Sequence, residues 1–275
     1  MIRLIATDLD GTLLTSSFAD PPRRPSRRTL AALEAARDAG VLVVPASGRQ
    51  PFSIAHGLRE TFLAHGTVIG ANGAIGVDLA TRHVYFERLV APEAQAALYH
   101  GLRARFPGLR CVSVRDGGNA FYPQHGYVGL MDPGDHGRMD ELLPEYDLDE
   151  VLGTPSLKFI VRDPHVSEAT LLDAALALNV PGCTCLTSGA PFVEVSAEGV
   201  DKGSGLASLC EVLGIEASEV VAFGDELNDL AMLRWAGHGV AMGNALDVVK
   251  RAADEVTTSN DADGLAIVVE RLLAG

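Results

Sequence analysis

The chain opens with Ile5-Ala6-Thr7-Asp8-Leu9-Asp10-Gly11-Thr12-Leu13-Leu14, an apolar run that ends in two carboxylates separated by one residue. This pattern predicts a buried strand that leads into a loop. Because side chains alternate across a strand, we expect Asp8 and Asp10 to face one space while Leu9 points away. Isolated Asp side chains have pKa values of about 3.9, so both carboxylates are charged at neutral pH and repel each other.

This pair of carboxylates needs a positive group beside it. A hard divalent cation with oxygen ligands is the natural candidate. Mg²⁺ is favoured, because proteins commonly hold it with one or two carboxylates together with phosphate oxygens. Asp8 and Asp10 are therefore candidate metal ligands.

The composition argues against several classes of function. The 275 residues are 47% hydrophobic and 21% charged, which is ordinary for a globular protein of one large domain or two modest ones. Lys and Arg number 22 against 36 Asp and Glu, and this balance of −14 disfavours nucleic acid or an anionic membrane as a partner. No charged and apolar leader precedes the first strand and no apolar run reaches membrane-spanning length, so we expect a cytoplasmic protein.

A second strand end carries a candidate phosphate site. Ser26 is placed to cap a helix that stops at Gly40, and the apolar run 41–44 follows as a strand. Continuous apolar strands indicate a parallel sheet that is covered on both faces. The strand leads into Ala46-Ser47-Gly48-Arg49, where backbone N–H groups and the Ser47 hydroxyl are able to donate to phosphate oxygens. Taken alone, the same stretch is equally a plain turn between a strand and a helix.

Two later segments add polar groups of complementary kinds. Lys202 stands at the start of an apolar helix, where a lone lysine is either a solvated charge or an anion ligand. The apolar strand 220–223 ends in Gly224-Asp225-Glu226-Leu227-Asn228-Asp229, at the end of a parallel strand where open α/β sheets bind ligands. By itself, Asn72-Gly73 favours a hairpin turn over a ligand contact.

The middle of the chain differs in character from its two ends. We predict a Rossmann-like α/β core with a parallel sheet from residues 1–82 and 188–275, which includes a strand over 192–195. Residues 83–187 are predicted to form an inserted α+β domain, with helices laid on an antiparallel sheet. Side chains of this insertion that could line a specificity surface, although packing or surface roles are favoured for each, are Arg115, Asn119, Tyr122, His125, Tyr127 and His136.

Taken together, the four motifs resemble the signature of the haloacid dehalogenase superfamily of phosphohydrolases. The resemblance rests on Asp8 to Thr12, Ser47-Gly48-Arg49, Lys202 and Gly224 to Asp229, in the family's order and spacing. The long insertion between the second and third motifs resembles the type IIB, or C2-type, cap of the Cof-like branch. Further segments that resemble this branch are Asn72-Gly73-Ala74 and Ala241-Met242-Gly243-Asn244-Ala245.

The resemblance implies a role for each motif residue. Asp8 would be the nucleophile that forms an aspartyl-phosphate, and Asp10 would protonate the leaving oxygen and then activate water. Mg²⁺ would be held by the Asp8 carboxylate, the Asp10 backbone carbonyl and Asp225. Asp229 would contact the ion through a water molecule or would support these ligands without contacting the ion. Arg49 would reach the leaving group or form a structural ion pair. The residues that would bind the phosphate, partly through backbone N–H groups, are Leu9, Ser47, Gly48, Arg49, Asn72, Lys202 and Asn228.

The resemblance also implies a Mg²⁺-dependent phosphatase that acts on a small phosphorylated metabolite. Sugar phosphates are the default substrates, and pyridoxal phosphate and flavin mononucleotide are credible ones. A phosphohexomutase of the same fold is an alternative, but it needs a basic cap and the insertion contains few arginines. A phospho-ligand-binding protein without activity is a second alternative, although all catalytic positions are filled.

Overall fold

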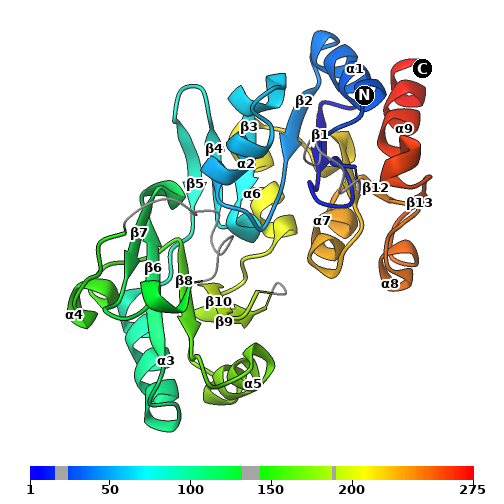
Figure 1. The fold of residues 1–275 in the computed structure, drawn as a ribbon. Helices are drawn as coiled ribbons and strands as arrows, with labels where there is room; N and C mark the ends of the chain where they lie inside the picture. Colours follow the sequence, from blue (N-terminus) through cyan, green and yellow to red (C-terminus); the bar gives the residue numbers. More distant parts are fainter. Residues whose placement is uncertain (16–23, 132–142, 188–189) are drawn as a thin grey trace. The chain divides into compact units, whose positions relative to one another are not determined.

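The computed structural model describes residues 1–15, 24–131, 143–187 and 190–275. The chain divides into two compact units (Figure 1). The core unit consists of Met1–Phe86 and Asp201–Gly275, and the inserted unit consists of Glu87–Val200.

The core unit is built on a parallel sheet. Its strands, in the spatial order β13-β12-β11-β1-β2, are β13 (Glu255–Val256), β12 (His238–Ala241), β11 (Val220–Gly224), β1 (Leu4–Thr7) and β2 (Leu42–Pro45). All four neighbouring pairs run parallel. Every residue of β1 and β11 is buried, as expected for central strands with both faces covered. The predicted α/β core with a parallel sheet is therefore confirmed.

Helices connect these strands. They are α1 (Arg27–Asp38), α2 (Pro51–Gly57), α6 (Lys202–Leu213), α7 (Leu230–Trp235), α8 (Asp247–Lys250) and α9 (Gly264–Leu273). Helix α1 lies beside α9, and α6 lies beside α7 (Figure 1). The expected cap of α1 is present, because the Ser26 hydroxyl accepts from the Thr29 N–H at 3.0 Å. Gly40 follows the end of α1 with a φ of +86°, a conformation that favours glycine.

A three-stranded sheet completes the core unit, in the order β3-β4-β5. The strands are β3 (Thr67–Gly70), β4 (Ile75–Asp78) and β5 (Val84–Glu87). Strands β3 and β4 are antiparallel, and Asn72 lies in the tight connection between them with a φ of 55°. The expected Asn-Gly turn is therefore confirmed.

The inserted unit is an antiparallel sheet with helices. Its strands, in the order β7-β6-β8-β10-β9, are β7 (Ala120–Pro123), β6 (Arg110–Arg115), β8 (Lys158–Arg162), β10 (Val193–Ala197) and β9 (Cys183–Leu186). Its helices are α3 (Pro92–Arg105), α4 (Leu148–Leu152) and α5 (Glu168–Leu178). Leu98 of α3, Phe159 of β8 and Leu171 of α5 share one buried apolar cluster, so these helices pack on the sheet.

Two expected details of the chain differ in the structure. The strand expected at 192–195 belongs to the inserted sheet, because β10 pairs with β8 and β9. The second division between the units consequently falls after Val200, whereas the sequence suggested residue 187. The first division falls after Phe86, and the sequence suggested that the insertion begins at residue 83. An apolar strand of this length fits either sheet, and only its pairing partners decide between them.

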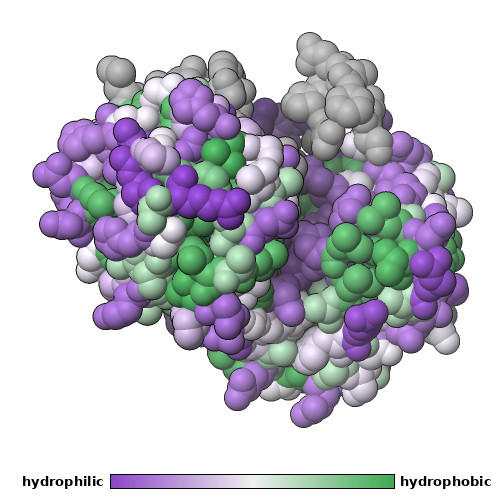
Figure 2. Space-filling view, turned by 90° about the horizontal axis from the view of Figure 1, so that it is seen from below, coloured by the Kyte–Doolittle hydropathy of each residue, from purple (hydrophilic) through white to green (hydrophobic). Residues whose placement is uncertain are grey.

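The surface mixes hydrophilic and hydrophobic areas. The face drawn in Figure 2 is largely hydrophilic, with separate hydrophobic areas between the polar ones. Single exposed apolar side chains such as Leu176 and Val212 are normal for a folded protein. In the described parts of the chain, every helix is too short or too polar to cross a bilayer.

Candidate active site

The predicted strand ends meet at one edge of the core sheet. Asp8 follows β1, Ser47 follows β2 and Asp225 follows β11, and these three strands are direct neighbours. The connections lead from β1 to β2 on one side and from β11 to β12 on the other, so the chain reverses direction across the sheet at β1. Open α/β sheets bind ligands at such a reversal, beyond the carboxyl ends of the strands.

Three carboxylates come together at this edge. Asp8, Asp225 and Asp229 are all buried, and each offers one oxygen within 4.8 Å of the others. The Thr12 hydroxyl donates to Asp225 Oδ1 at 2.7 Å. Gly11 passes so close that a Cβ at this position would lie 2.2 Å from Asp225 Oδ2, and its φ is +84°. Glycine is therefore required where the loop after β1 crosses Asp225.

Lys202 enters this cluster from the first position of α6. Its Nζ lies 2.5 Å from Asp8 Oδ1 and 2.6 Å from Asp229 Oδ1. The Asp201 side chain caps α6 by accepting from the Ser204 N–H at 2.7 Å. This cap fixes the start of α6 and therefore the position of the Lys202 backbone. The side chain of Lys202 is only 1% exposed. The reading of this residue as a solvated surface charge is therefore wrong.

Asp229 is fully buried and anchored on both oxygens. Besides the contact of Oδ1 with Lys202, Oδ2 accepts from the backbone N–H groups of Asp225 and Glu226 at 2.9 and 3.0 Å. A Cβ at Gly224 would lie 2.4 Å from the Asp229 Cβ, so the end of β11 must be glycine for this side chain to fit. Asp229 thus ties the lysine to the backbone that carries Asp225.

Burial sets the proton affinities of the cluster. It raises the pKa of Asp8 to about 7, although the neighbouring Lys202 ammonium acts in the opposite direction. Burial also raises the pKa of Asp225, to about 6. For Lys202, burial alone would lower the pKa, but attraction to Asp8 and Asp229 outweighs it and the pKa is raised. Lys202 is therefore a permanent cation at neutral pH.

Asp10 points into a different environment from Asp8. Its carboxylate accepts from Arg49 Nε at 2.9 Å and Nη2 at 2.5 Å, a two-point ion pair. The Asp10 side chain is 37% exposed, whereas that of Asp8 is 8% exposed. The two carboxylates thus differ in solvent access, and Asp8 belongs to the buried cluster of three carboxylates. Of the two roles considered for Arg49, the structure contains the ion pair.

Three of the expected phosphate-binding residues form hydrogen bonds with other predicted site residues, whereas the side chain of a fourth points into the core. Ser47 is buried, and its hydroxyl accepts from the Arg49 N–H at 3.2 Å. The Asn228 amide donates to Asn72 Oδ1 at 3.2 Å, and a Cβ at Gly48 would lie 3.0 Å from that same oxygen. Asn72 therefore serves both as the turn residue and as a contact of the fourth motif. The Leu9 side chain is fully buried and points into the core.

Sequence reasoning assigned no role to Asn244 and Asn260. Asn244 Nδ2 lies 2.8 Å from the Gly11 carbonyl and 3.4 Å from Asp225 Oδ2, while its Oδ1 accepts from the Asn260 N–H at 3.0 Å. The Asn260 amide donates in turn to the Leu14 carbonyl at 2.8 Å. These two residues hold the loop after β1 against Asp225. The only sequence signal for them was the resemblance of the segment around Asn244 to Cof-type proteins.

The side chains considered for a specificity surface in the inserted unit are mostly structural. Arg115 donates to the carbonyls of Glu150 and Val151 and stacks on the Tyr122 ring, with 4.2 Å between its Cζ and the ring centre. Tyr127 is fully buried in an apolar cluster. Asn119 donates to a local carbonyl, His125 lies beside Glu145 and Asp147, and His136 lies outside the described residues.

Comparison with known proteins places this site in a family. Residues 5–269 match the model of a haloacid dehalogenase-like hydrolase. The chain is 27% identical to the 5-amino-6-(5-phospho-D-ribitylamino)uracil phosphatase YwtE of Bacillus subtilis, over 100% of this chain and 99% of that one. It is 29% identical to phosphatase YwpJ of the same organism, over 99% and 100% of the two chains.

A solved structure extends this likeness to the whole fold. The subclass IIB sugar phosphatase BT4131 superposes with a TM-score of 0.78 at 26% identity, over 98% of both chains. With a family match across nearly the whole chain, the described geometry and this likeness lead to one conclusion. The chain belongs to the haloacid dehalogenase-like hydrolases, in the Cof-like branch with a type IIB cap, and it is a phosphatase.

Proposed function

We propose that the chain is a Mg²⁺-dependent phosphatase that hydrolyses small phosphorylated metabolites through an aspartyl-phosphate, an acyl phosphate formed at Asp8. The observation that carries the proposal is the buried cluster of Asp8, Asp225, Asp229 and Lys202 at the carboxyl edge of the parallel sheet. Its carboxylates outnumber its ammonium group, and a divalent cation would cancel the excess.

The donor set of the cluster fits Mg²⁺. All three side chains offer hard carboxylate oxygens, the ligand type that Mg²⁺ prefers, and they lie in a common space. Asp8 and Asp225 would hold the ion together with the backbone carbonyl of Asp10. Asp229 would remain behind them, because its Oδ2 already accepts from two backbone N–H groups and its Oδ1 contacts the Lys202 ammonium at 2.6 Å. When bound, the cation would offset the repulsion between Asp8 and the substrate phosphate.

The proposed reaction has two steps. An Asp8 oxygen forms a bond to phosphorus while the ester P–O bond breaks, and the leaving oxygen takes a proton from Asp10. Asp10 then accepts a proton from water as the water oxygen attacks phosphorus, and the bond between Asp8 and phosphorus breaks. Its solvent access suits Asp10 for this proton exchange, and the burial of Asp8 suits a nucleophile. Lys202, Ser47 and Asn228 stabilise charge on the phosphoryl oxygens.

Arg49 positions the acid in this scheme. Its two-point ion pair holds Asp10 in the carboxylate form, which is the form that accepts the proton from water in the second step, and the Asp10 side chain is 37% exposed. Leu9, Gly48 and Asn72 contribute to phosphate binding through the backbone and the turn between β3 and β4. The inserted unit is proposed to select substrates as a cap domain.

The relatives point to a substrate class. BT4131 is named a sugar phosphatase, and YwtE is named for a phosphoribitylamino compound, so both names describe a phosphate on a polyhydroxylated carbon chain. We therefore favour sugar and polyol phosphates over pyridoxal phosphate and flavin mononucleotide. The phosphohexomutase alternative gains no support, because the relatives described above are named phosphatases.

One assay tests the proposal. Wild type, Asp8→Asn and Asp10→Asn are compared in the hydrolysis of p-nitrophenyl phosphate, with and without Mg²⁺. We expect activity only in wild type with the metal. Full activity of Asp8→Asn, or wild-type activity unchanged by EDTA, would contradict the mechanism. A panel of glucose 6-phosphate, the phosphoribitylamino compound, pyridoxal phosphate and flavin mononucleotide then ranks the substrates by kcat/KM.

A further inference from the structure

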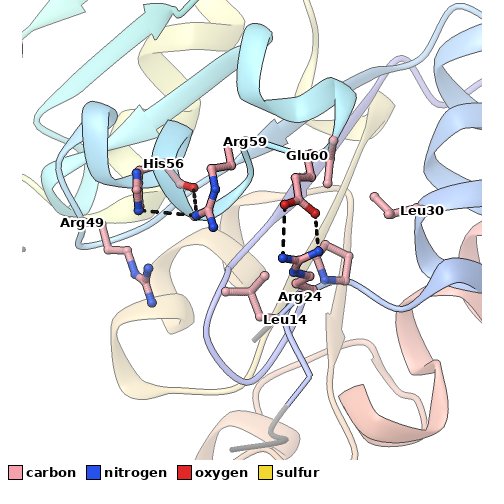
Figure 3. A pocket seen from close by; sticks show the side chains of 10 residues that line it. Leu14, Arg24, Leu30, Arg49, His56, Arg59 and Glu60 are labelled. Atoms are coloured by element: carbon pink, nitrogen blue, oxygen red, sulfur yellow. Dashed lines mark hydrogen bonds and ion pairs between the residues drawn. The ribbon is translucent and has the colours of Figure 1, made fainter. Parts of the chain in front are cut away.

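The core unit contains a pocket whose lining includes Arg49 but otherwise consists of residues without a role in the proposed reaction. Its volume is about 450 Å³, within the range of small-molecule sites. The lining comes from the loop after β1, the segment that leads into α1, and both ends of α2 (Figure 3). The lining residues are Leu14, Arg24, Pro25, Leu30, Arg49, His56, Gly57, Arg59, Glu60 and Thr61.

The charge of this lining is opposite to that of the chain. Arg24, Arg49 and Arg59 line the pocket together with a single carboxylate, that of Glu60. The whole chain carries a formal charge of −14. Arg24 faces the carboxylate of Glu60 and Arg49 faces that of Asp10, so one positive charge of this lining remains uncompensated by an ion pair among the described residues. An anionic ligand would compensate for this charge.

The three arginines differ in the groups that their guanidinium groups contact. Arg24 forms an ion pair with Glu60 (Figure 3), and Arg49 forms one with Asp10. Within the described part of the chain, the Arg59 guanidinium contacts His56, with Nη1 3.1 Å from the carbonyl oxygen and 3.4 Å from the ring Nε2. Among the described residues, no carboxylate forms an ion pair with Arg59. Its guanidinium is thus the lining cation that is available to a ligand.

The ion pair between Arg24 and Glu60 is weak enough to yield to a ligand. Both side chains are about half exposed, at 41% and 56%. Exposed pairs of this kind contribute about 0–1 kcal/mol, because water screens both charges. An anion in the pocket therefore competes with Glu60 for Arg24 at little cost.

The floor of the pocket is apolar. Leu14 and Pro25 are buried, and Leu30 is partly buried. Figure 3 places Leu14 below Arg59, on the same side as Arg24. A ligand that fills the space thus needs an apolar body as well as an anionic group.

We propose that this pocket binds a small organic anion, with its phosphate, sulfonate or carboxylate group at Arg59 and Arg24 and its apolar part on Leu14 and Leu30. Arg49 lies at the border between this pocket and Asp10. The ligand is therefore either the distal part of a substrate or a separate effector, and both present the same chemistry to the pocket. The site lies within the core unit and does not depend on the reaction proposed above.

Binding of 2-naphthalenesulfonate to the metal-free enzyme, measured by isothermal titration calorimetry, tests the site. Arg59→Gln should weaken binding about tenfold, since a charge-assisted hydrogen bond is lost. Glu60→Gln should tighten it about threefold, because Arg24 is released from its ion pair. The matched control is Arg27→Gln, which removes the same charge from an exposed position next to the pocket but outside its lining. It should leave the affinity unchanged.

The opposite directions of the two variants protect the test against misfolding, which cannot tighten binding. The proposal is overturned if Arg59→Gln and Glu60→Gln both bind like wild type. It is equally overturned if Arg27→Gln loses as much affinity as Arg59→Gln, since binding would then reflect overall charge. These titrations contain no substrate, so they stand even if the hydrolytic mechanism fails.

Steady-state kinetics with p-nitrophenyl phosphate then separate the two sources of ligand. If the pocket holds the distal part of a substrate, the sulfonate should raise KM without changing kcat. If it holds a separate effector, the sulfonate should change kcat at saturating substrate. Arg59→Gln should then need about tenfold more sulfonate to produce the same change in kcat.

Discussion

Two of the three lysines in this chain are buried against carboxylates, one in each unit. In the core unit, Lys202 Nζ contacts Asp8 and Asp229 at 2.5 and 2.6 Å. In the inserted unit, Lys158 Nζ on β8 contacts Glu194 on β10 at 2.8 Å. Both lysines are nearly inaccessible to solvent, so burial and ion pairing alone do not distinguish the two places.

The two clusters differ in charge balance. When ionised, the core cluster holds three carboxylates and one ammonium group, which gives −3 + 1 = −2. The ion pair of Lys158 with Glu194 holds one charge of each sign. Excess charge in a buried space is unfavourable unless a ligand compensates for it. Excess charge at the carboxyl ends of parallel strands therefore indicates a reaction site, whereas a balanced pair within a sheet indicates structure.

The largest expected effect is on turnover at the core cluster. Asp8→Asn should lower kcat for p-nitrophenyl phosphate by about 10⁴-fold or more, because an amide cannot serve as the nucleophile. Glu194→Gln is the matched change in the inserted unit, and per folded molecule it should retain kcat within about threefold. An equal loss in both variants would remove the distinction between the clusters.

The next effect is on stability, and here the larger change is expected in the inserted unit. Glu194→Gln should lower the free energy of unfolding by about 3 kcal/mol, because it removes the carboxylate charge that faces the buried Lys158 ammonium. The double variant Lys158→Met with Glu194→Leu should recover most of this loss, since two apolar side chains can replace a balanced pair. Urea denaturation monitored by circular dichroism measures both. A double variant as unstable as the single one would show that the pair does more than balance charge.

A smaller effect is expected from the residues that hold the core cluster in place. Asn244→Ala should weaken Mg²⁺ binding about tenfold, because Asn244 ties the loop at Gly11 to Asp225. Isothermal titration calorimetry with Mg²⁺ alone measures this, with Glu194→Gln as the variant in which the affinity should not change. Wild-type affinity in Asn244→Ala would mean that the loop keeps its place without the asparagine.

The smallest effect is a dependence of metal stabilisation on pH. The folded-state pKa values of Asp8 and Asp225, about 7 and about 6, exceed their usual value of 3.8, so the metal-free fold binds extra protons. Its stability should therefore fall as pH rises from about 4 to about 7. Mg²⁺ displaces these protons, so the rise in unfolding temperature that it causes should be larger at pH 8 than at pH 5, by a few degrees. Thermal unfolding with and without Mg²⁺ at both pH values checks this, and equal rises would contradict it.

The meeting of three strand ends at one edge of the core sheet could be predicted because its signals are local. The apolar runs before Asp8, Ser47 and Asp225 identify strands, and the parallel arrangement then brings their ends together. The cap of α1 at Ser26 and its end near Gly40 are likewise set by neighbouring residues. Lys202 was ambiguous by itself, because nothing nearby in the sequence indicates that its side chain runs inward to Asp8.

The features that escaped prediction depend on distant parts of the chain. Strand β10 was assigned to the core because an apolar pattern does not indicate which strands it pairs with, and its partners in the structure are β8 and β9. The same holds for Asn244, whose contacts lie at Gly11, Asp225 and Asn260. An isolated asparagine carries no periodic signal, so only the folded structure reveals what it joins.

The central claim is that Asp8 takes the phosphoryl group. Wild-type enzyme is quenched in acid during turnover of a sugar phosphate with Mg²⁺, reduced with borohydride, which converts an acyl phosphate to an alcohol, and analysed by peptide mass spectrometry. The account predicts homoserine at position 8, present only when both substrate and Mg²⁺ were added. Unmodified Asp8 in enzyme that is turning over, with the modification at another residue, would contradict it.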